Sequence, residues 1–213
     1  MSYSLLIPIY NEIFTVQKLL DKLNDIRSEI QIIIINDGST DGTHKILNQV
    51  KNRIEVINMP INSGKGEAIK QGLNKVKNQT TILMDGDLEV DPTDIAKLIE
   101  VYELNINNYS AVVGTRWNEK DINFITINEI ANNLINKLFN CIYRTSFHDV
   151  LCCYKILNTD LLKSFNLISE KFGIETEIMA NLAIRNIKTK EVKVNYERRS
   201  KNQGKKLRAI DGL

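Results

Sequence analysis

Three carboxylates follow an apolar run near the middle of the chain. Residues 82–84 read Ile-Leu-Met, and Asp85, Gly86, Asp87 and Glu89 come directly after them. A buried strand that ends in this way places acidic oxygens at the rim of a sheet, where they can bind a hard divalent cation. An isolated Asp-x-Asp is also typical of a solvated acidic turn, so the rest of the chain must decide between the two interpretations.

Polar side chains also follow other strands that the apolar pattern predicts. We expect buried strands over residues 4–10, 31–35 and 111–113. Because open parallel sheets bind ligands beyond the carboxyl ends of their strands, several acids on one rim predict a binding site there. The side chains at these ends belong to Tyr10, Asn11, Glu12, Asp37, Thr115 and Arg116.

The glycines after the third predicted strand do not form a phosphate-binding loop. Gly64-Lys65-Gly66 lacks the earlier glycine and the following Ser or Thr of a P-loop, and the dinucleotide-binding pattern is absent too. A phosphate-bearing ligand would therefore be neutralised mainly by a cation and by basic side chains.

The first part of the chain alternates strands with helices. Apolar residues recur at helical spacing between the strands, as in the segment 16–23. This alternation predicts a single domain of the α/β class, with a mostly parallel sheet that helices cover on both faces. The predicted strands are residues 4–10, 31–35, 55–59, a strand that ends at Asp85, and 111–113.

The pattern is looser beyond Arg116. An apolar stripe runs along residues 127–142, and we expect it to lie in the core. Residues 174–183 suggest another helix. The alternation of apolar and polar residues over 191–196 predicts a strand with one wet face.

Composition places the chain among ordinary globular proteins. Its 213 residues suffice for one domain with a substantial core. No apolar run approaches the ~20 residues of a membrane span, and we expect no signal peptide. Cys141, Cys152 and Cys153 have no metal-type spacing, so reduced thiols in a cytoplasmic protein are expected.

Basic residues are concentrated at the end of the sequence. Residues 197–213 hold six basic side chains against two acidic ones, a charge of +4, which leaves −2 for the rest because the net charge is +2. Such a tail is either a solvated end or a segment that meets phosphates or an anionic membrane surface. Nucleic acid is not an expected partner, because no aromatic residue follows Tyr196 on which bases could stack.

Five motifs occur in the first 116 residues: I-P-I-Y-N-E (7–12), N-D-G-S-T-D-G-T (36–43), N-S-G-K-G-E-A (62–68), M-D-G-D-L (84–88) and G-T-R (114–116). In this order they resemble the motifs of family 2 glycosyltransferases. The similarity is greatest to the polyprenyl- or dolichyl-phosphate sugar synthases. Weaker similarity continues at 148–155, 175–177 and 199–212.

The resemblance implies a GT-A fold and an inverting transfer of a hexose from a nucleotide sugar such as UDP-glucose or GDP-mannose. Residues 1–116 would form the nucleotide-sugar-binding half, 117–196 the acceptor half, and 197–213 a basic tail. Asp85, Asp87 and Glu89 would bind Mg²⁺ or Mn²⁺ on the donor diphosphate. The donor itself would be surrounded by Pro8, Tyr10, Asn11, Glu12, Asp37, Gly64, Lys65, Asp85 and Gly86.

Asp37 is the candidate for reading the nucleotide base. An aspartate that follows a strand is also a common cap of its own loop, so a purely structural role stays open for this residue. Lys65 can equally be a solvated loop lysine.

Two kinds of acceptor fit the remaining residues. A lipid phosphate is already ionised and needs only basic side chains to hold it, for which Arg116, Arg199, Lys205 and Lys206 are candidates. A sugar hydroxyl would instead need a carboxylate to take its proton, and Asp149, Glu175 and Glu177 are candidates for that role, beside Asp87 and Arg116 as catalytic residues. We favour the polyprenyl phosphate over the glycan.

The sequence departs from the family pattern at three points. Glu89 stands where the synthases often have glutamine, and Val113 replaces the glutamine of the Q-x-x-R-W pattern of processive enzymes. Many synthases carry C-terminal membrane helices that this sequence lacks, so contact with the bilayer would be peripheral, at its cytoplasmic face. A non-catalytic module that binds nucleotide sugars remains the alternative to an enzyme.

Overall fold

A seven-stranded sheet is the centre of the molecule. The computed structural model describes residues 1–50, 53–117 and 127–199, and in this part of the chain the strand order is β3-β2-β1-β4-β6-β5-β7. The strands are β1 (Tyr3–Ile9), β2 (Gln31–Asn36), β3 (Ile54–Asn58), β4 (Thr80–Leu83), β5 (Ala111–Thr115), β6 (Lys155–Asn158) and β7 (Thr189–Lys193). The pairs β1–β2, β2–β3, β1–β4 and β5–β7 are parallel, which agrees with the predicted mostly parallel sheet.

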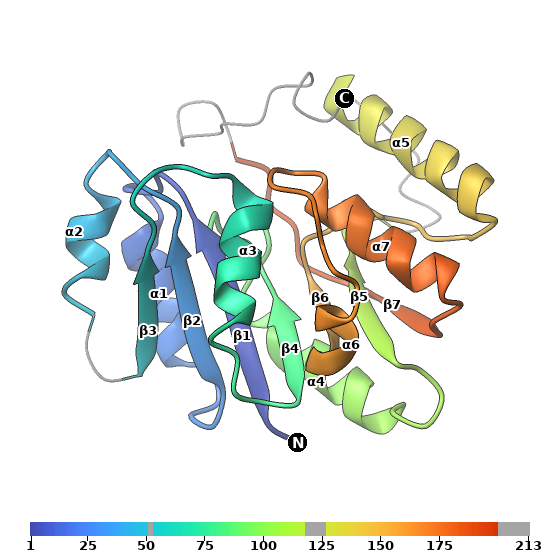
Figure 1. Ribbon diagram of the computed structural model, residues 1–213, viewed down its shortest axis with the longest axis horizontal. Coiled ribbons are helices and arrows are strands. Elements are labelled where there is room, and N and C mark those ends of the chain that lie inside the picture. Colours follow the sequence, from blue (N-terminus) through green and yellow to red (C-terminus); the bar gives the residue numbers. More distant parts are fainter. Residues whose placement is uncertain (51–52, 118–126, 200–213) are drawn as a thin grey trace.

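Helices cover both faces of this sheet (Figure 1). Successive side chains of a strand point to opposite faces, so Leu5 and Ile7 of β1 pack with one layer of helices and Leu6 with the other. One layer contains α1 (Val16–Asn24), α2 (Thr43–Leu47) and α4 (Asp94–Leu104). The other contains α3 (Lys65–Leu73), α5 (Ile127–Tyr143), α6 (Thr159–Lys163) and α7 (Ile174–Ile184).

Strand β6 was not predicted. It lies between β4 and β5 and runs antiparallel to both, with Ile156 opposite Ile82 on one side and opposite Val112 on the other. The strand has four residues, and its apolar pair stands between a lysine and an asparagine. Lys155 is nevertheless buried, because its ammonium donates to the Cys152 carbonyl at 2.5 Å. Two apolar residues flanked by polar ones are too short a segment to show the periodicity by which a strand is recognised in a sequence.

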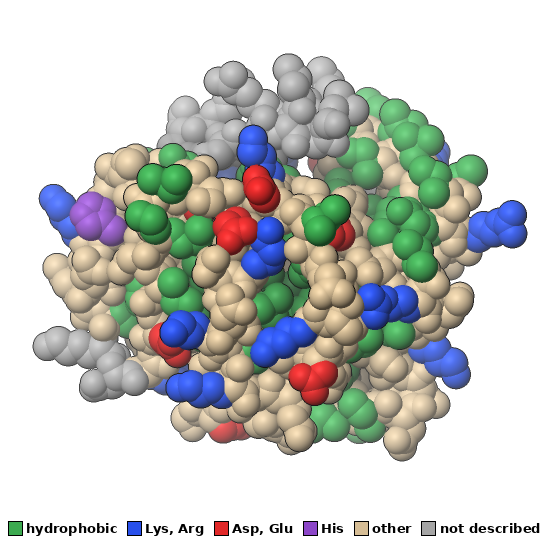
Figure 2. All heavy atoms as spheres, viewed as in Figure 1, with side chains coloured by type: hydrophobic (Ala, Val, Ile, Leu, Met, Phe, Trp, Pro, Cys, Tyr) green, Lys and Arg blue, Asp and Glu red, His purple; other side chains and the backbone are tan. Residues whose placement is uncertain are grey.

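The prediction that the stripe on α5 belongs to the core is wrong for four of its residues. Phe139 is buried, whereas the side chains one turn apart along the outer face are 54–70% exposed: Ile130, Leu134, Leu138 and Ile142. We call these four residues the α5 ridge. Figure 2 shows hydrophobic side chains gathered at the upper right, where α5 lies. Periodicity identifies an apolar helix face but not whether the fold supplies a partner for it.

The chain after β7 returns to the acidic run. Val194 is buried as predicted, and Tyr196 forms an isolated antiparallel bridge with Val90. The Glu197 N–H donates to the Glu89 carbonyl at 2.8 Å. Residues 196–199 therefore lie against the segment that follows β4. None of the helices in the described ranges combines the length and hydropathy that a bilayer crossing requires.

Candidate active site

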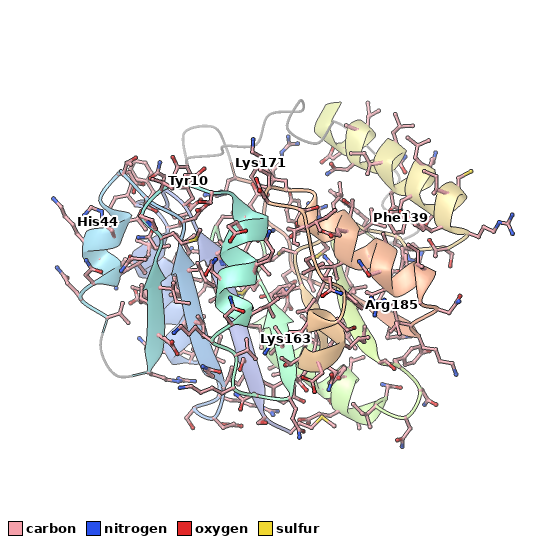
Figure 3. The ribbon with its side chains drawn as sticks, viewed as in Figure 1. Tyr10, His44, Phe139, Lys163, Lys171 and Arg185 are labelled. Atoms are coloured by element: carbon pink, nitrogen blue, oxygen red, sulfur yellow. The ribbon has the colours of Figure 1, made fainter. Side chains whose placement is uncertain are left out.

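A cavity of about 430 Å³ opens beyond the carboxyl ends of β1, β2 and β4. It brings together every residue predicted to surround the donor and all three acids predicted to bind the metal. Figure 3 shows Tyr10 and Lys171 at this upper edge of the molecule. The lining residues are Pro8, Ile9, Tyr10, Asn11, Glu12, Asp37, Asn62, Gly64, Lys65, Asp85, Gly86, Asp87, Glu89, Lys171, Phe172 and Arg199.

Asp37 caps the loop that follows β3. One carboxylate oxygen accepts the Ser63 N–H at 2.7 Å, and the other accepts the Gly64 N–H at 2.8 Å and the Asn62 amide at 2.9 Å. The side chain is 2% exposed. These contacts fit the structural role that the sequence left open. They also shape the wall of the cavity, because Asn62 and Gly64 line it.

The start of α3 packs closely against the loop before α7. Gly64 has φ = +96°, and a Cβ there would lie 2.5 Å from the Glu170 carbonyl oxygen. The Glu67 N–H donates to that same oxygen at 3.0 Å. Only glycine permits this approach without strain. It positions Lys171 and Phe172, which were not predicted as site residues, at the cavity.

Lys65 joins three elements at the floor of the site. From the first turn of α3, its ammonium lies 2.5 Å from an Asp85 oxygen and also forms an ion pair with Glu175 in the first turn of α7. Burial by itself would lower the pKa of Lys65, but the two carboxylates outweigh it and raise the pKa. Lys65 is therefore a fixed positive charge and not a solvated loop lysine.

Arg199 reaches the cavity from the segment after β7. Its two terminal nitrogens donate to Glu12 at 2.7 Å and to Asp87 at 3.0 Å, and its Nε lies 3.9 Å from a Glu89 oxygen. The guanidinium is largely buried. Arg199 was predicted to hold the acceptor phosphate. In this structure it neutralises acids that were predicted to bind the donor and its metal.

The carboxylates fit a divalent cation that arrives with a diphosphate. Burial and the nearby Asp85 carboxylate raise the pKa of Asp87 to about 6, although Arg199 opposes the shift. Within the described ranges, no three Asp, Glu, His or Cys side chains are close enough to hold a metal by themselves. Mg²⁺ commonly binds through one or two carboxylates plus substrate phosphates, so Asp85 and Asp87 at one cavity suit such an ion.

Arg116 and Asp149 do not reach the cavity. They bind each other through Nε at 2.8 Å and Nη2 at 2.9 Å, and Asp149 also accepts the Arg116 N–H at 2.9 Å. The guanidinium carbon lies 5.6 Å from the Trp117 ring centre and 5.3 Å from that of Tyr196. This geometry provides neither a free phosphate-binding arginine nor a free base.

The other base candidates are also engaged. Glu177 accepts the N–H groups of Ile168 at 2.8 Å and Ser169 at 2.9 Å, and these bonds lower its pKa although burial raises it. Glu175 is the candidate that the structure brings near the cavity, where Lys65 holds it. Lys205 and Lys206 lie outside the described residues.

Comparison with known proteins identifies the family. The model of Glycosyl transferase family 2 matches residues 4–165. Glycosyltransferase AglJ of Haloferax volcanii is 30% identical over 196 residues, which cover 90% of this chain and 62% of that protein. Dodecaprenyl-phosphate galacturonate synthase of Rhizobium johnstonii is 28% identical and is matched over 80% of this chain and 52% of its own length. The chain thus spans between half and two-thirds of these relatives.

Solved structures confirm the fold. Glucosyl-3-phosphoglycerate synthase from Mycobacterium tuberculosis, crystallised with Mn²⁺, UDP-glucose and phosphoglyceric acid, superposes with a TM-score of 0.68 at 16% identity. The match covers 95% of this chain and 74% of that one. The predicted α/β fold of the GT-A type, with its mostly parallel sheet, is therefore correct.

Proposed function

Since this chain belongs to glycosyl transferase family 2, we propose that it moves a hexose from a nucleotide sugar to a polyprenyl-phosphate-type acceptor, with inversion and with the help of Mg²⁺ or Mn²⁺. The observation that carries the proposal is the cavity, because the predicted donor and metal residues meet there from separate strand ends. Residues 1–116 would supply most of the donor site and 117–196 most of the acceptor site. Arg199 lines the donor cavity from the later part of the chain, and Glu175 forms an ion pair with the cavity residue Lys65.

Asp85 and Asp87, with Glu89 beside them, would hold the cation, which stabilises the negative charge of the departing nucleoside diphosphate. Lys65 would supply a further positive charge at the donor, kept in place by the carboxylates of Asp85 and Glu175. Lys171 and Phe172 would cover the donor from the loop before α7. A covered donor is protected from attack by water.

The state of the base candidates favours a phosphate acceptor. Asp149 is bound by Arg116, Glu177 by two backbone N–H groups, and Glu175 by Lys65. A carboxylate engaged in this way is not free to approach an acceptor hydroxyl, as a general base must. A lipid phosphate is an anion at neutral pH and attacks without a protein base. The name of the Rhizobium relative, a dodecaprenyl-phosphate galacturonate synthase, supports the same class of acceptor.

The α5 ridge supports contact with the membrane that would carry such an acceptor. Lys137 and Arg144 are exposed near the ridge, while Glu129 at the start of α5 lies 3.9 Å from the Arg198 guanidinium. An apolar helix face with basic neighbours is typical of helices that lie in the interface of an anionic bilayer. We place this contact at the cytoplasmic face.

A product assay tests the proposal. The purified protein is incubated with Mn²⁺ and either UDP-glucose or GDP-mannose, and with a short-chain polyprenyl phosphate or a free hexose as acceptor. Sugar transferred to the lipid phosphate supports the proposal. Transfer to the hexose would favour the hydroxyl acceptor, with Glu175 released from Lys65 as the base. Donor binding without transfer to either acceptor would favour a non-catalytic module.

A further inference from the structure

The guanidinium of Arg199 stands among three carboxylates that come from two separate strand ends. Glu12 follows β1, and Asp87 and Glu89 follow β4. Arg199 donates to the first two and has its Nε 3.9 Å from the third. Like charges this close repel one another unless a cation lies between them. In this structure the cation between them is the Arg199 side chain.

The bonds of Arg199 differ from those of an arginine with a purely structural role. Arg116 gives two nitrogens to the same carboxylate, the bidentate arrangement that holds an arginine most firmly. Arg199 divides its two bonds between Glu12 and Asp87, and its Nε is buried without a hydrogen-bond partner among the described residues. A buried donor without a partner reduces what the contact stabilises. The Arg199 guanidinium is thus held mainly by electrostatic attraction to the carboxylates and less by the geometry of its hydrogen bonds.

The backbone next to this side chain is anchored independently. The Arg199 N–H lies 3.3 Å from a Glu89 carboxylate oxygen, the Glu197 N–H donates to the Glu89 carbonyl, and Tyr196 bridges Val90. The side chain can therefore leave the carboxylates by rotation about its own bonds, without detachment of residues 196 and 197.

We propose that Arg199 is the resident counter-cation of the donor site and excludes the divalent cation until a nucleotide arrives with it. Both neutralise Asp87 and its neighbours, so they compete for the same negative charge. This inference rests on the proposed use of Mg²⁺ or Mn²⁺. Metal without nucleotide must displace Arg199 by itself, whereas metal with a diphosphate brings additional ligands, and the diphosphate offers the displaced guanidinium a new anionic partner.

The test is a titration of the nucleotide-free protein with Mn²⁺, in which the electron paramagnetic resonance signal of free Mn²⁺ gives the dissociation constant. Arg199→Gln removes the competing charge, and we expect it to bind Mn²⁺ about tenfold more tightly than the wild type. Arg198→Gln is the matched control, because its guanidinium lies 3.9 Å from Glu129 and the residue does not line the cavity. We expect its affinity for Mn²⁺ to equal that of the wild type.

Equal or weaker Mn²⁺ binding by Arg199→Gln would overturn the inference, because Arg199 would then be a support for the carboxylates and not their competitor. If Arg199→Gln does not fold, Arg199→Lys decides, since one ammonium cannot give separate nitrogens to Glu12 and Asp87. If Arg199→Lys binds Mn²⁺ more tightly than the wild type, by up to tenfold, competition is supported. If its affinity for Mn²⁺ is unchanged, competition is refuted.

A second series with UDP separates this inference from the proposed function. If the wild type binds Mn²⁺ in the presence of UDP and Arg199→Gln gains nothing in its absence, the counter-cation inference alone fails. If none of the proteins binds Mn²⁺ even with UDP, the metal-assisted function and the inference fail together.

Discussion

Two groups of buried charge lie near each other in this molecule, and their bonding differs. Arg116 and Asp149 form a closed pair, in which one carboxylate receives three hydrogen bonds from one residue. At the cavity, Lys65 and Arg199 are each shared between carboxylates of different elements. The closed pair satisfies its own members and is not part of the cavity lining. The shared cations hold acids in place at an open cavity, where a ligand can exchange with them.

The sequence pattern does not distinguish these two groups of charged residues. Arg116 and Asp85 both follow a predicted strand, and both match a family motif. Their position in the fold distinguishes them. Asp85 and Asp87 line the cavity, whereas Arg116 and Asp149 do not. We therefore expect substitutions in the Arg116–Asp149 pair to change stability, and substitutions at the cavity to change ligand binding and turnover.

The largest effect is expected from Asp87→Asn. Loss of the carboxylate would remove charge stabilisation of the leaving group and lower kcat by about 10³-fold, the size typical of a lost electrostatic contact in a transition state. Sugar transfer to the lipid phosphate measures it. Asp21→Asn, on the exposed side of α1, is the control and should keep wild-type turnover. Turnover that survives in Asp87→Asn would place the chemistry outside this cavity.

Asp149→Ala should affect folding more than binding. It leaves the buried Arg116 guanidinium without its carboxylate, which costs about 3 kcal/mol of the free energy of unfolding. Urea unfolding gives this value, and Mn²⁺ affinity measured on the folded fraction should stay near that of the wild type. A variant of unchanged stability and weakened Mn²⁺ binding would contradict the distinction between the two groups of charge.

The α5 ridge extends the comparison to apolar surface. Leu134→Ser with Leu138→Ser should reduce the binding of the protein to phosphatidylserine vesicles about tenfold in a flotation assay, because buried apolar area drives interfacial binding. Leu104→Ser with Ile184→Ser is the control, since these residues are 75% and 66% exposed on other helices. An equal loss in both double variants, or no vesicle binding by the wild type, would argue against α5 as the membrane contact.

The smallest effect concerns Glu177. Its pKa is lower in the folded protein than in the unfolded chain, so its contribution to stability is present above the unfolded pKa of about 4.3 and is lost as the pH falls through the folded pKa. Glu177→Gln should therefore lower stability at pH 7 by less than about 1 kcal/mol, because solvent screens this partly exposed group. Thermal unfolding at pH 7 and pH 3 should show a smaller pH dependence for the variant.

The acidic residues at the carboxyl ends of the strands could be predicted because their position depends on local sequence. Each parallel strand is an apolar run, and the polar residues after it lie at the same edge of the sheet once the strands are in register. For this reason Asp37, Asp85 and Asp87 lie together at one cavity. The predicted roles of Arg116 as a phosphate-binding residue and of Asp149 as a base depended on which groups these side chains contact. Similarity of motifs does not reveal such contacts.

The remaining features depend on contacts between distant parts of the chain. The partners of Arg199 are far from it in sequence, so no spacing could indicate that a tail arginine neutralises the donor acids. Strand β6 is too short to show a period. The stripe on α5 was detected correctly as an apolar face, and only the packed structure reveals that the side chains on its outer side are exposed.

The position of β6 has a consequence for how the chain is made. Among the described residues, strand β5 pairs only with β6 and β7, so these partners are synthesised about 40 and about 75 residues later. During translation, an apolar segment with free edges must wait for them while β1 to β4 can already assemble. The nascent chain is thus most vulnerable to aggregation, and most in need of a chaperone, in the interval between residue 115 and the emergence of residue 158 from the ribosome.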